Sequence, residues 1–170
     1  TDTNHQNAKI LTIDPQRVQE AVDAGRVAVV AGSQGVSTDN NVTFLGRGGS
    51  DTTAVALAHA LNADACELYT DVPGVFTTDP RVCEQAKKMP SISFDELLEM
   101  TAVGCPKPAM RSVEVARSYG VKLHVRSAFT WEPGTWVTKE ENSMEKPIIS
   151  AVVPDTSQSK VTVSGVPDNP

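Results

Sequence analysis

A strand-turn-helix stretch at residues 42–61 constrains the fold more than any other part of the chain, because its turn holds three glycines within four residues. Glycine has no Cβ, so such a turn can bend sharply and approach a ligand closely. We expect Ser50 or Asp51 to cap the helix, whose first turn then presents free N–H groups to an anion. Arg47 adds a planar cation that suits a carboxylate or a phosphate.

The glycine stretch is not one of the common nucleotide motifs. It lacks the Gly-Lys-Ser/Thr of a P-loop and the Gly-x-Gly-x-x-Gly of a dinucleotide site. A plain strand-to-helix turn without a ligand is the alternative interpretation at this point.

Composition limits the class of protein. The 170 residues, 39% of them hydrophobic, suit one globular domain or one domain with a small piece of another. A net charge of −6 argues against a nucleic-acid partner, and no apolar run is long enough to span a membrane. The three widely spaced cysteines suggest neither disulfides nor a zinc site, so we expect a cytoplasmic protein, and we assign no metal ligands.

Strand-like and helix-like segments alternate along the chain, which predicts an α/β fold with a mostly parallel sheet and helices on both faces. Residues 27–31 form an apolar, β-branched run, which is typical of a fully buried parallel strand. Residues 121–126 alternate strictly, which predicts a strand with one buried face. The other strands are expected at residues 9–13, 42–45, 66–69 and 136–137, and the helices at residues 15–24, 51–62, 94–100 and 113–119.

Three loops are expected at the carboxyl ends of parallel strands, where open α/β sheets bind their ligands: residues 32–35, 46–53 and 70–81. Their cations and carboxylates would suit phosphoryl transfer, in which Mg²⁺ bridges the phosphates. Taken singly, these residues could instead cap a helix, shape a turn or lie on the surface. The charged residues are Arg47, Asp51, Asp71, Asp79 and Arg81.

Two long motifs carry a family resemblance. Residues 44–54, Phe-Leu-Gly-Arg-Gly-Gly-Ser-Asp-Thr-Thr-Ala, and residues 69–81, Tyr-Thr-Asp-Val-Pro-Gly-Val-Phe-Thr-Thr-Asp-Pro-Arg, closely resemble the aspartokinases. The similarity continues through residues 93–100, 111–114, 125–127, 132–135 and 160–163, so it covers in effect the whole chain.

The resemblance implies the second half of an amino-acid-kinase domain followed by the start of an ACT regulatory domain. Residues 1–138 would belong to the kinase domain, residues 139–146 to a linker, and residues 147–170 to the ACT domain, with a β-hairpin of strands 147–153 and 160–166. The family transfers the γ-phosphate of ATP, used with Mg²⁺, to the side-chain carboxylate of L-aspartate, at the entry to lysine, threonine and methionine synthesis.

The resemblance also assigns site residues by motif position. The aspartate site would comprise Arg47, Gly48, Gly49, Ser50 and Asp51. The catalytic residues would be Arg47, Asp51 and Lys107. The nucleotide site would comprise Thr70, Asp71, Phe76, Thr77, Thr78, Asp79, Pro80, Arg81 and Lys107.

The sequence departs from the family pattern in two places. Pro106 stands where the family usually has its phosphate-binding lysine, and Lys107 follows one residue later, before Pro108; Phe76 replaces a common tyrosine. The family's amino-terminal Lys-Phe/Tyr-Gly-Gly-Thr-Ser motif has no counterpart, so we expect these 170 residues alone to have little or no kinase activity. The ACT region implies an oligomeric full-length protein and feedback by lysine or threonine.

Two other functions stay open. One is another amino-acid or carbamate kinase of the same fold, which residues 47–53 and the ACT-like tail argue against. The other is a non-catalytic nucleotide-binding or regulatory module, which the irregular Pro106-Lys107-Pro108 turn allows. Such a module would bind nucleotide while ignoring aspartate.

Overall fold

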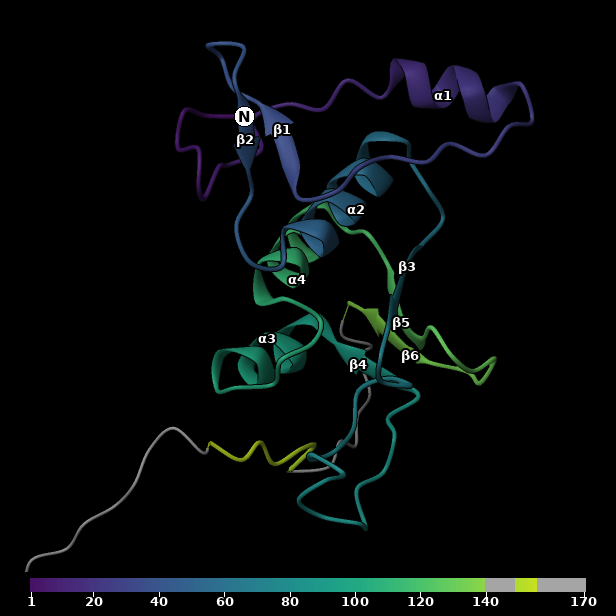
Figure 1. The fold of residues 1–170 in the computed structure, drawn as a ribbon. Coiled ribbons are helices and arrows are strands. Elements are labelled where there is room, and N and C mark those ends of the chain that lie inside the picture. Colours follow the sequence, from purple (N-terminus) through teal and green to yellow (C-terminus); the bar gives the residue numbers. More distant parts are fainter. Residues whose placement is uncertain (140–148, 156–170) are drawn as a thin grey trace, which may run out of the picture.

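A computed structural model describes residues 1–139 and 149–155, with four helices and six strands assigned there (Figure 1). The helices are α1 (Gln16–Asp23), α2 (Gly49–Ala60), α3 (Phe94–Ala102) and α4 (Met110–Tyr119). The strands are β1 (Gln34–Val36), β2 (Val42–Phe44), β3 (Cys66–Thr70), β4 (Ser91–Ser93), β5 (Leu123–Ser127) and β6 (Thr135–Thr138).

The main sheet has four strands in the order β3-β5-β6-β4. Strands β3 and β5 run parallel, as do β4 and β6, whereas β5 and β6 are antiparallel. Two of the three pairings are therefore parallel, and the prediction of an α/β fold with a mostly parallel sheet is confirmed. Strand β4 was not anticipated from the sequence, because three residues are too few to give a clear alternation.

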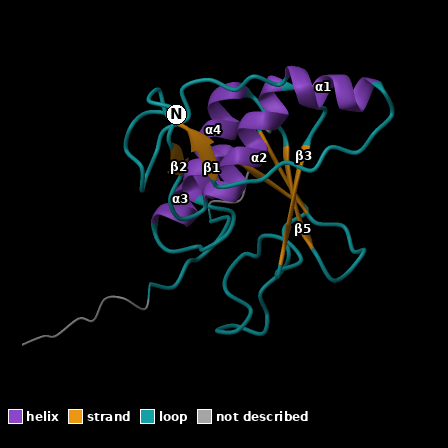
Figure 2. Ribbon diagram, turned by 45° about the horizontal axis from the view of Figure 1, so that its top comes forward, coloured by secondary structure: helices purple, strands orange, loops and turns teal. Residues whose placement is uncertain are grey.

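Helices α2, α3 and α4 pack on one face of this sheet (Figure 2). Their apolar side chains meet those of alternate strand residues, which point to the same face because the side-chain period of a strand is two. The core includes Val55, Leu97, Val113, Leu68, Leu123, Val125 and Val137. Packing in this core holds in position the carboxyl end of β3 and the amino end of α4, beside which the site residues lie.

The opposite face of the sheet carries polar and aromatic side chains, and no helix of residues 1–139 and 149–155 packs on it, so the predicted helices on both faces are not found in this part of the chain. Glu67 accepts hydrogen bonds from the Tyr69 hydroxyl at 2.8 Å and from Arg126 Nη1 at 3.0 Å. His124 belongs to this face yet is only 7% exposed, because Trp136 stacks on its ring with centroids 4.0 Å apart. The expected strand at residues 121–126 is present as β5, but its second face is thus more buried than strict alternation suggested.

Two strands predicted near the amino terminus are absent. Residues 9–13 and 27–31 have no strand assignment. Val27 and Val29 are 93% and 95% exposed, so the prediction of a fully buried parallel strand is wrong for this segment. A strand needs a partner to satisfy its backbone hydrogen bonds, and none of the other described strands pairs with residues 27–31.

The first predicted helix is present as α1, but none of its residues is buried. Asp14, just before the helix, accepts a hydrogen bond at Oδ1 from the N–H of Gln16, at 3.0 Å. Pro15 is the residue before the helix rather than its first member.

Strands β1 and β2 form a separate antiparallel ribbon with Val36 opposite Val42. Residues 34 and 35 were expected to lie in a loop but belong to β1, and the loops at residues 32–35 and 46–53 were expected to follow parallel strands. Both expectations are wrong. Of the three predicted loops, only residues 70–81 follow a strand with a parallel partner, β3 beside β5.

The end of the chain was predicted to hold a hairpin. The described part of its first strand, residues 149–153, has no strand assignment, and the second strand, residues 160–166, lies outside the described residues. No helix within residues 1–139 and 149–155 is long and apolar enough to cross a membrane.

Candidate active site

The glycine-rich stretch forms a tight turn between β2 and α2. Gly46 and Gly48 have φ angles of +86° and +71°, a region that glycine adopts easily and other residues adopt at a cost. A Cβ on Gly48 would collide with the side chain of Ala109, and one on Gly46 would lie 2.7 Å from Asn7 Oδ1. Both positions therefore need glycine for its conformation and for its small size.

Helix α2 begins earlier than the sequence suggested. Its first residue is Gly49, Gly48 is the capping residue, and no side chain caps the helix. The prediction that Ser50 or Asp51 would cap is wrong, because both lie inside the first turn. A carboxylate in the first turn is still favourable, since it faces the positive end of the helix dipole.

Asp51 instead reaches across to α4. Its Oδ2 accepts a hydrogen bond from the backbone N–H of Ala109, at 3.2 Å. Arg47 is exposed and has no hydrogen bond or ion pair with any other described residue. The turn thus offers an unpaired guanidinium a few residues from a fixed carboxylate, an arrangement that can bind a small carboxylic acid.

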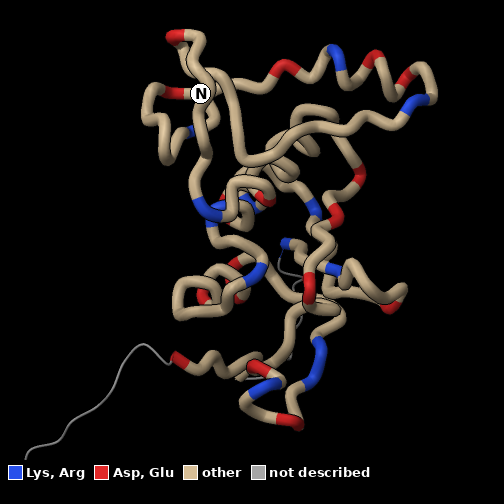
Figure 3. The backbone as a smooth tube through the Cα atoms, in the orientation of Figure 1, with Lys and Arg blue, Asp and Glu red and all other residues tan. Residues whose placement is uncertain are grey.

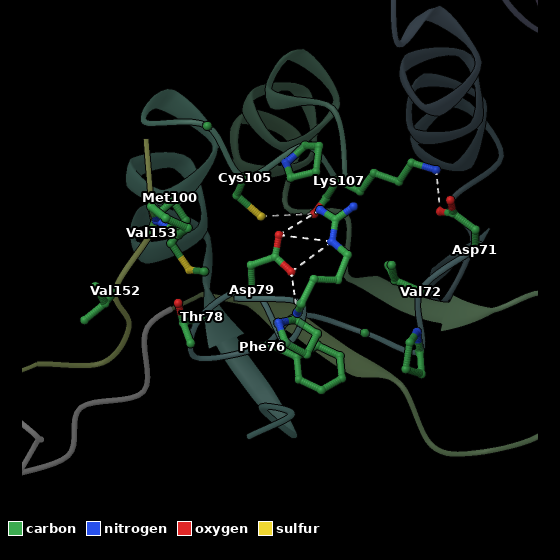
Figure 4. A pocket seen from close by; sticks show the side chains of 17 residues that line it. Asp71, Val72, Phe76, Thr78, Asp79, Met100, Cys105, Lys107, Val152 and Val153 are labelled. Atoms are coloured by element: carbon green, nitrogen blue, oxygen red, sulfur yellow. Dashed lines mark hydrogen bonds and ion pairs between the residues drawn. The ribbon is translucent and has the colours of Figure 1, made fainter. Parts of the chain in front are cut away.

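A pocket of about 580 Å³ opens beside the loop that follows β3 (Figure 4). This volume lies within the range of small-molecule and cofactor sites. Seven residues predicted to bind nucleotide line it: Asp71, Phe76, Thr78, Asp79, Pro80, Arg81 and Lys107. The residues of the glycine turn do not line the pocket.

Two other predicted nucleotide residues, Thr70 and Thr77, are not among those that line the pocket. The Thr70 hydroxyl accepts a hydrogen bond from the N–H of Val72 at 3.0 Å, which turns the chain at the end of β3. The Thr77 hydroxyl accepts from the N–H of Lys87 at 3.1 Å, which ties the loop to the segment before β4. In this structure both threonines shape the loop.

Ion pairs set the charge of the pocket. Lys107 Nζ lies 2.6 Å from Asp71 Oδ1, and Arg81 holds both oxygens of Asp79, the closest at 2.7 Å. The hydrogen bond from Lys107 lowers the pKa of Asp71, and the hydrogen bond from Arg81 lowers the pKa of Asp79. Both carboxylates are therefore charged at neutral pH, and each is paired with a cation that could turn to an incoming phosphate.

Lys107 reaches the pocket despite the prolines on both sides of it. It belongs to a connection between α3 and α4, of which Gly104, Cys105 and Pro106 also line the pocket. Cys105 is partly buried beside it, and this burial raises the pKa of the thiol, so the cysteine is a weak nucleophile near neutral pH.

One short connection contacts both candidate sites. At Lys107 it pairs with Asp71 in the pocket, and two residues later the N–H of Ala109 binds Asp51 of the glycine turn. Arg111, in the first turn of α4, donates to the carbonyl of Leu45 at 2.6 Å. The pocket and the glycine turn are thus joined through residues 107–111.

Sequence reasoning missed several residues that line the pocket. Val72, Pro73 and Gly74 lie within the predicted loop at residues 70–81. They could therefore have been assigned to the site together with the polar residues of that loop. Met100, Val152, Val153 and Pro154 come from α3 and from the end of the described chain, and no local pattern connects those segments to the loop.

Acidic and basic residues are interspersed along the chain (Figure 3). Among residues 1–139 and 149–155, no group of three or more histidine, cysteine, aspartate or glutamate side chains could hold a metal ion. The pocket carboxylates Asp71 and Asp79 each form an ion pair, with Lys107 and Arg81 respectively.

Comparison with known proteins identifies the family of the chain. A model of the amino acid kinase family matches residues 1–127. The chain belongs to the amino acid kinase family. An aspartate kinase of Stutzerimonas stutzeri is 53% identical over 171 aligned positions, covering 100% of this chain and 42% of that protein. The chain thus spans less than half the length of this relative.

Two solved structures are also similar. Aspartate kinase from Synechocystis has a TM-score of 0.65 at 46% identity, over 78% of this chain and 22% of that one. E. coli aspartokinase III in complex with aspartate and ADP has a TM-score of 0.69 at 32% identity, over 84% of this chain and 33% of that one. The same E. coli enzyme in complex with lysine and aspartate has a TM-score of 0.68 at 31% identity, over the same shares of the two chains.

Proposed function

We propose that the protein containing this chain is an aspartate kinase, which transfers the γ-phosphate of ATP to the side-chain carboxylate of L-aspartate. The observation that carries the proposal is the connection at residues 107–109, which contacts a nucleotide-sized pocket on one side and the glycine turn on the other. A kinase must hold two substrates next to each other, and this geometry suits that need.

In this proposal each part has one task. Arg47 binds a carboxylate of aspartate, and Asp51, held by the N–H of Ala109, contacts the substrate and organises the reacting centre. The nucleotide lies in the pocket, with Lys107 and Arg81 turning from their carboxylates toward its phosphates. Preorganised cations of this kind stabilise the charge that develops on a transferred phosphoryl group.

Magnesium fits this site as a partner of the nucleotide. The described residues offer no cluster of ligands for an ion of their own, and Mg²⁺ commonly needs only one or two carboxylates besides phosphate oxygens. Asp71 and Asp79 are the pocket carboxylates that could supply them once their cations turn to phosphate. When bound, the ion would neutralise phosphate charge.

The wider assignment follows the same similarity. We propose that residues 1–138 belong to the kinase domain, residues 139–146 to a linker and residues 147–170 to the start of an ACT domain. The full-length protein would be a cytoplasmic oligomer regulated by lysine or threonine. E. coli aspartokinase III, which was crystallised with lysine, supports the possibility of such an effector.

The test is aspartate-dependent release of ADP by the full-length protein, with the acyl phosphate trapped by hydroxylamine. We expect Arg47→Ala to raise the KM for aspartate by about tenfold or more, because a charged hydrogen bond to the substrate is lost. Arg26→Ala is the matched control, since Arg26 is exposed and distant in sequence from both loops. The 170-residue chain by itself should show little or no turnover.

Two outcomes would contradict the proposal. Phosphorylation of a different carboxylic acid in preference to aspartate would indicate another kinase of the same fold. Nucleotide binding without any aspartate-dependent turnover by the full-length protein would indicate a regulatory module.

A further inference from the structure

Residues 150–154 form a short segment of which residues 152–154 line the pocket, although the segment is outside the residues matched by the family model. Val152 and Val153 lie beside Thr78 and Met100, at the end of the pocket away from the Lys107–Asp71 pair (Figure 4), and Pro154 also lines the pocket. The segment contacts the loop that we assign to the nucleotide.

Two hydrogen bonds hold the segment in place. The N–H of Val152 donates to the carbonyl of Thr77 at 2.8 Å. The Ser150 hydroxyl donates to Glu96 Oε1 at 2.7 Å. Glu96 is itself fixed, because its other oxygen accepts the N–H of Ser93 at 3.1 Å in the capping box of α3.

Packing supports the same placement. The side chains of Ala151 and Val153 pack against the core of the sheet and helices. The carbonyl oxygen of Pro154 approaches Gly104, lying 4.0 Å from the position that a Cβ would occupy there. The segment therefore spans the pocket from the Thr77 side to the connection that carries Lys107.

The chemistry of the segment differs from that of the rest of the pocket. Residues 149–154 contain no charged side chain, whereas the cations and carboxylates of the pocket belong to residues 71–81 and to Lys107. The phosphates of a nucleotide would bind near the charged residues, and its flat heterocyclic base would bind against an apolar wall. Val152 keeps 64% of its surface exposed, so it has apolar area available to a ligand.

We propose that residues 152–154, held in place by Ser150, form a further part of the nucleotide site, as the apolar wall against which the base binds. This inference rests on the proposed function. It implies that the segment leading from the kinase part into the remainder of the protein is a direct component of the nucleotide site, so its displacement would weaken nucleotide binding.

The test compares Val152→Asn with Ile149→Asn in the full-length protein. Ile149 is a matched control, because it is 72% exposed, lies three residues away and does not line the pocket. The measurements are the Kd of ADP and of inorganic tripolyphosphate by calorimetry, together with the KM for aspartate. We expect Val152→Asn to weaken ADP binding about fivefold or more, since apolar contact with the base is lost, while tripolyphosphate binding and the KM for aspartate are unchanged. Ile149→Asn should leave all three values unchanged.

A second variant tests the tether without altering the wall. Ser150→Ala removes the hydrogen bond to Glu96 and should raise the KM for ATP while leaving the fold intact, as judged by the melting temperature. Unchanged ADP affinity in Val152→Asn, or an equal loss for tripolyphosphate, would overturn the inference. Wild-type protein that binds ADP but does not phosphorylate aspartate would overturn the proposed function alone.

Discussion

At the scale of single residues, the ion pair of Lys107 with Asp71 keeps the Asp71 carboxylate of the pocket charged. The Lys107 ammonium lies 2.6 Å from the carboxylate and lowers the pKa of Asp71. A carboxylate whose pKa is lower in the folded chain stabilises the fold above its ordinary pKa, and this contribution is lost as the pH falls through the lowered value. The pair is therefore intact across the neutral range and is lost as the carboxylate takes up a proton in acid.

We expect Lys107→Met to raise the pKa of Asp71 toward the ordinary value of an aspartate, because the main cause of the shift is removed. The pKa is measured by following the Asp71 carboxyl carbon in an NMR titration of the chain. Lys122→Met is the control, since Lys122 is exposed and is not a partner of Asp71. An unchanged Asp71 pKa in Lys107→Met would mean that the ion pair does not persist in solution.

A second residue-scale prediction concerns the space around Gly48. Gly48→Ala places a Cβ at φ +71° and against Ala109, whereas Gly120→Ala places one at φ +70° with no atom within 4 Å. The two variants share the conformational cost of about 1–2 kcal/mol, and only the first adds a steric clash. We expect Gly48→Ala to lower the free energy of unfolding by about 1–3 kcal/mol more than Gly120→Ala, as measured by urea denaturation. Equal losses would show that the turn moves away from α4 at little cost.

At the scale of elements, the first turn of α4 holds the glycine turn in position. Arg111 donates to the carbonyls of Leu45 and Ala8, at 2.6 and 2.8 Å. Under the proposed function, we expect Arg111→Ala in the full-length protein to raise the KM for aspartate and to lower kcat by about tenfold, because charged hydrogen bonds of this kind contribute more than 1 kcal/mol. The KM for ATP should change little, since Arg111 does not line the pocket.

Arg117 supplies the control on the same helix. It pairs with Asp95, and its side chain is 55% exposed, so Arg117→Ala should leave all three kinetic values unchanged. Arg111→Lys should recover part of the activity, since lysine keeps the charge but can satisfy only one carbonyl well. A rise in the KM for ATP equal to that for aspartate would indicate general loosening of the fold instead of a positioning role.

Elements whose signals are local could be predicted from the sequence. The capping box at the start of α3 is present, with the N–H of Glu96 bound to Ser93 Oγ at 3.2 Å. Helix α4 ends at Tyr119, the predicted last residue, and Gly120 follows it in the left-handed conformation. Both features depend on residues within one turn of a helix, so the sequence contains all the information they need.

Features that depend on distant partners could not be predicted in the same way. The carboxylate of Asp51 had a plausible local role as a cap, but its hydrogen bond goes to Ala109, 58 residues away. The motif at residues 69–81 pointed to the pocket, yet the wall at residues 152–154 has no pattern that links it to that loop. Residues 27–31 had the composition of a buried strand, but composition does not reveal whether a partner strand is present.

At the scale of the whole molecule, the amino-terminal region leaves apolar surface and strand edges uncovered. Val36, Val42 and Phe44 are 56%, 72% and 49% exposed, and the pairing of β1 with β2 puts them on one face of the ribbon. Residues 27–31 have no backbone hydrogen bond to other described residues. Exposed apolar strands of this kind tend to pair with other chains.

We therefore expect the purified 170-residue chain to self-associate with rising concentration, and Val27→Lys combined with Val29→Lys to reduce this association. The two valines are 93% and 95% exposed, so the substitutions should not lower the melting temperature. Sedimentation velocity over a range of concentrations is the measurement. Phe129→Lys combined with Trp131→Lys is the control pair, because these side chains are 82% and 91% exposed but lie outside the unpaired segment. An equal effect of the two pairs would mean that association follows exposed apolar area in general, whereas an effect of the valine pair alone would locate it at residues 27–31.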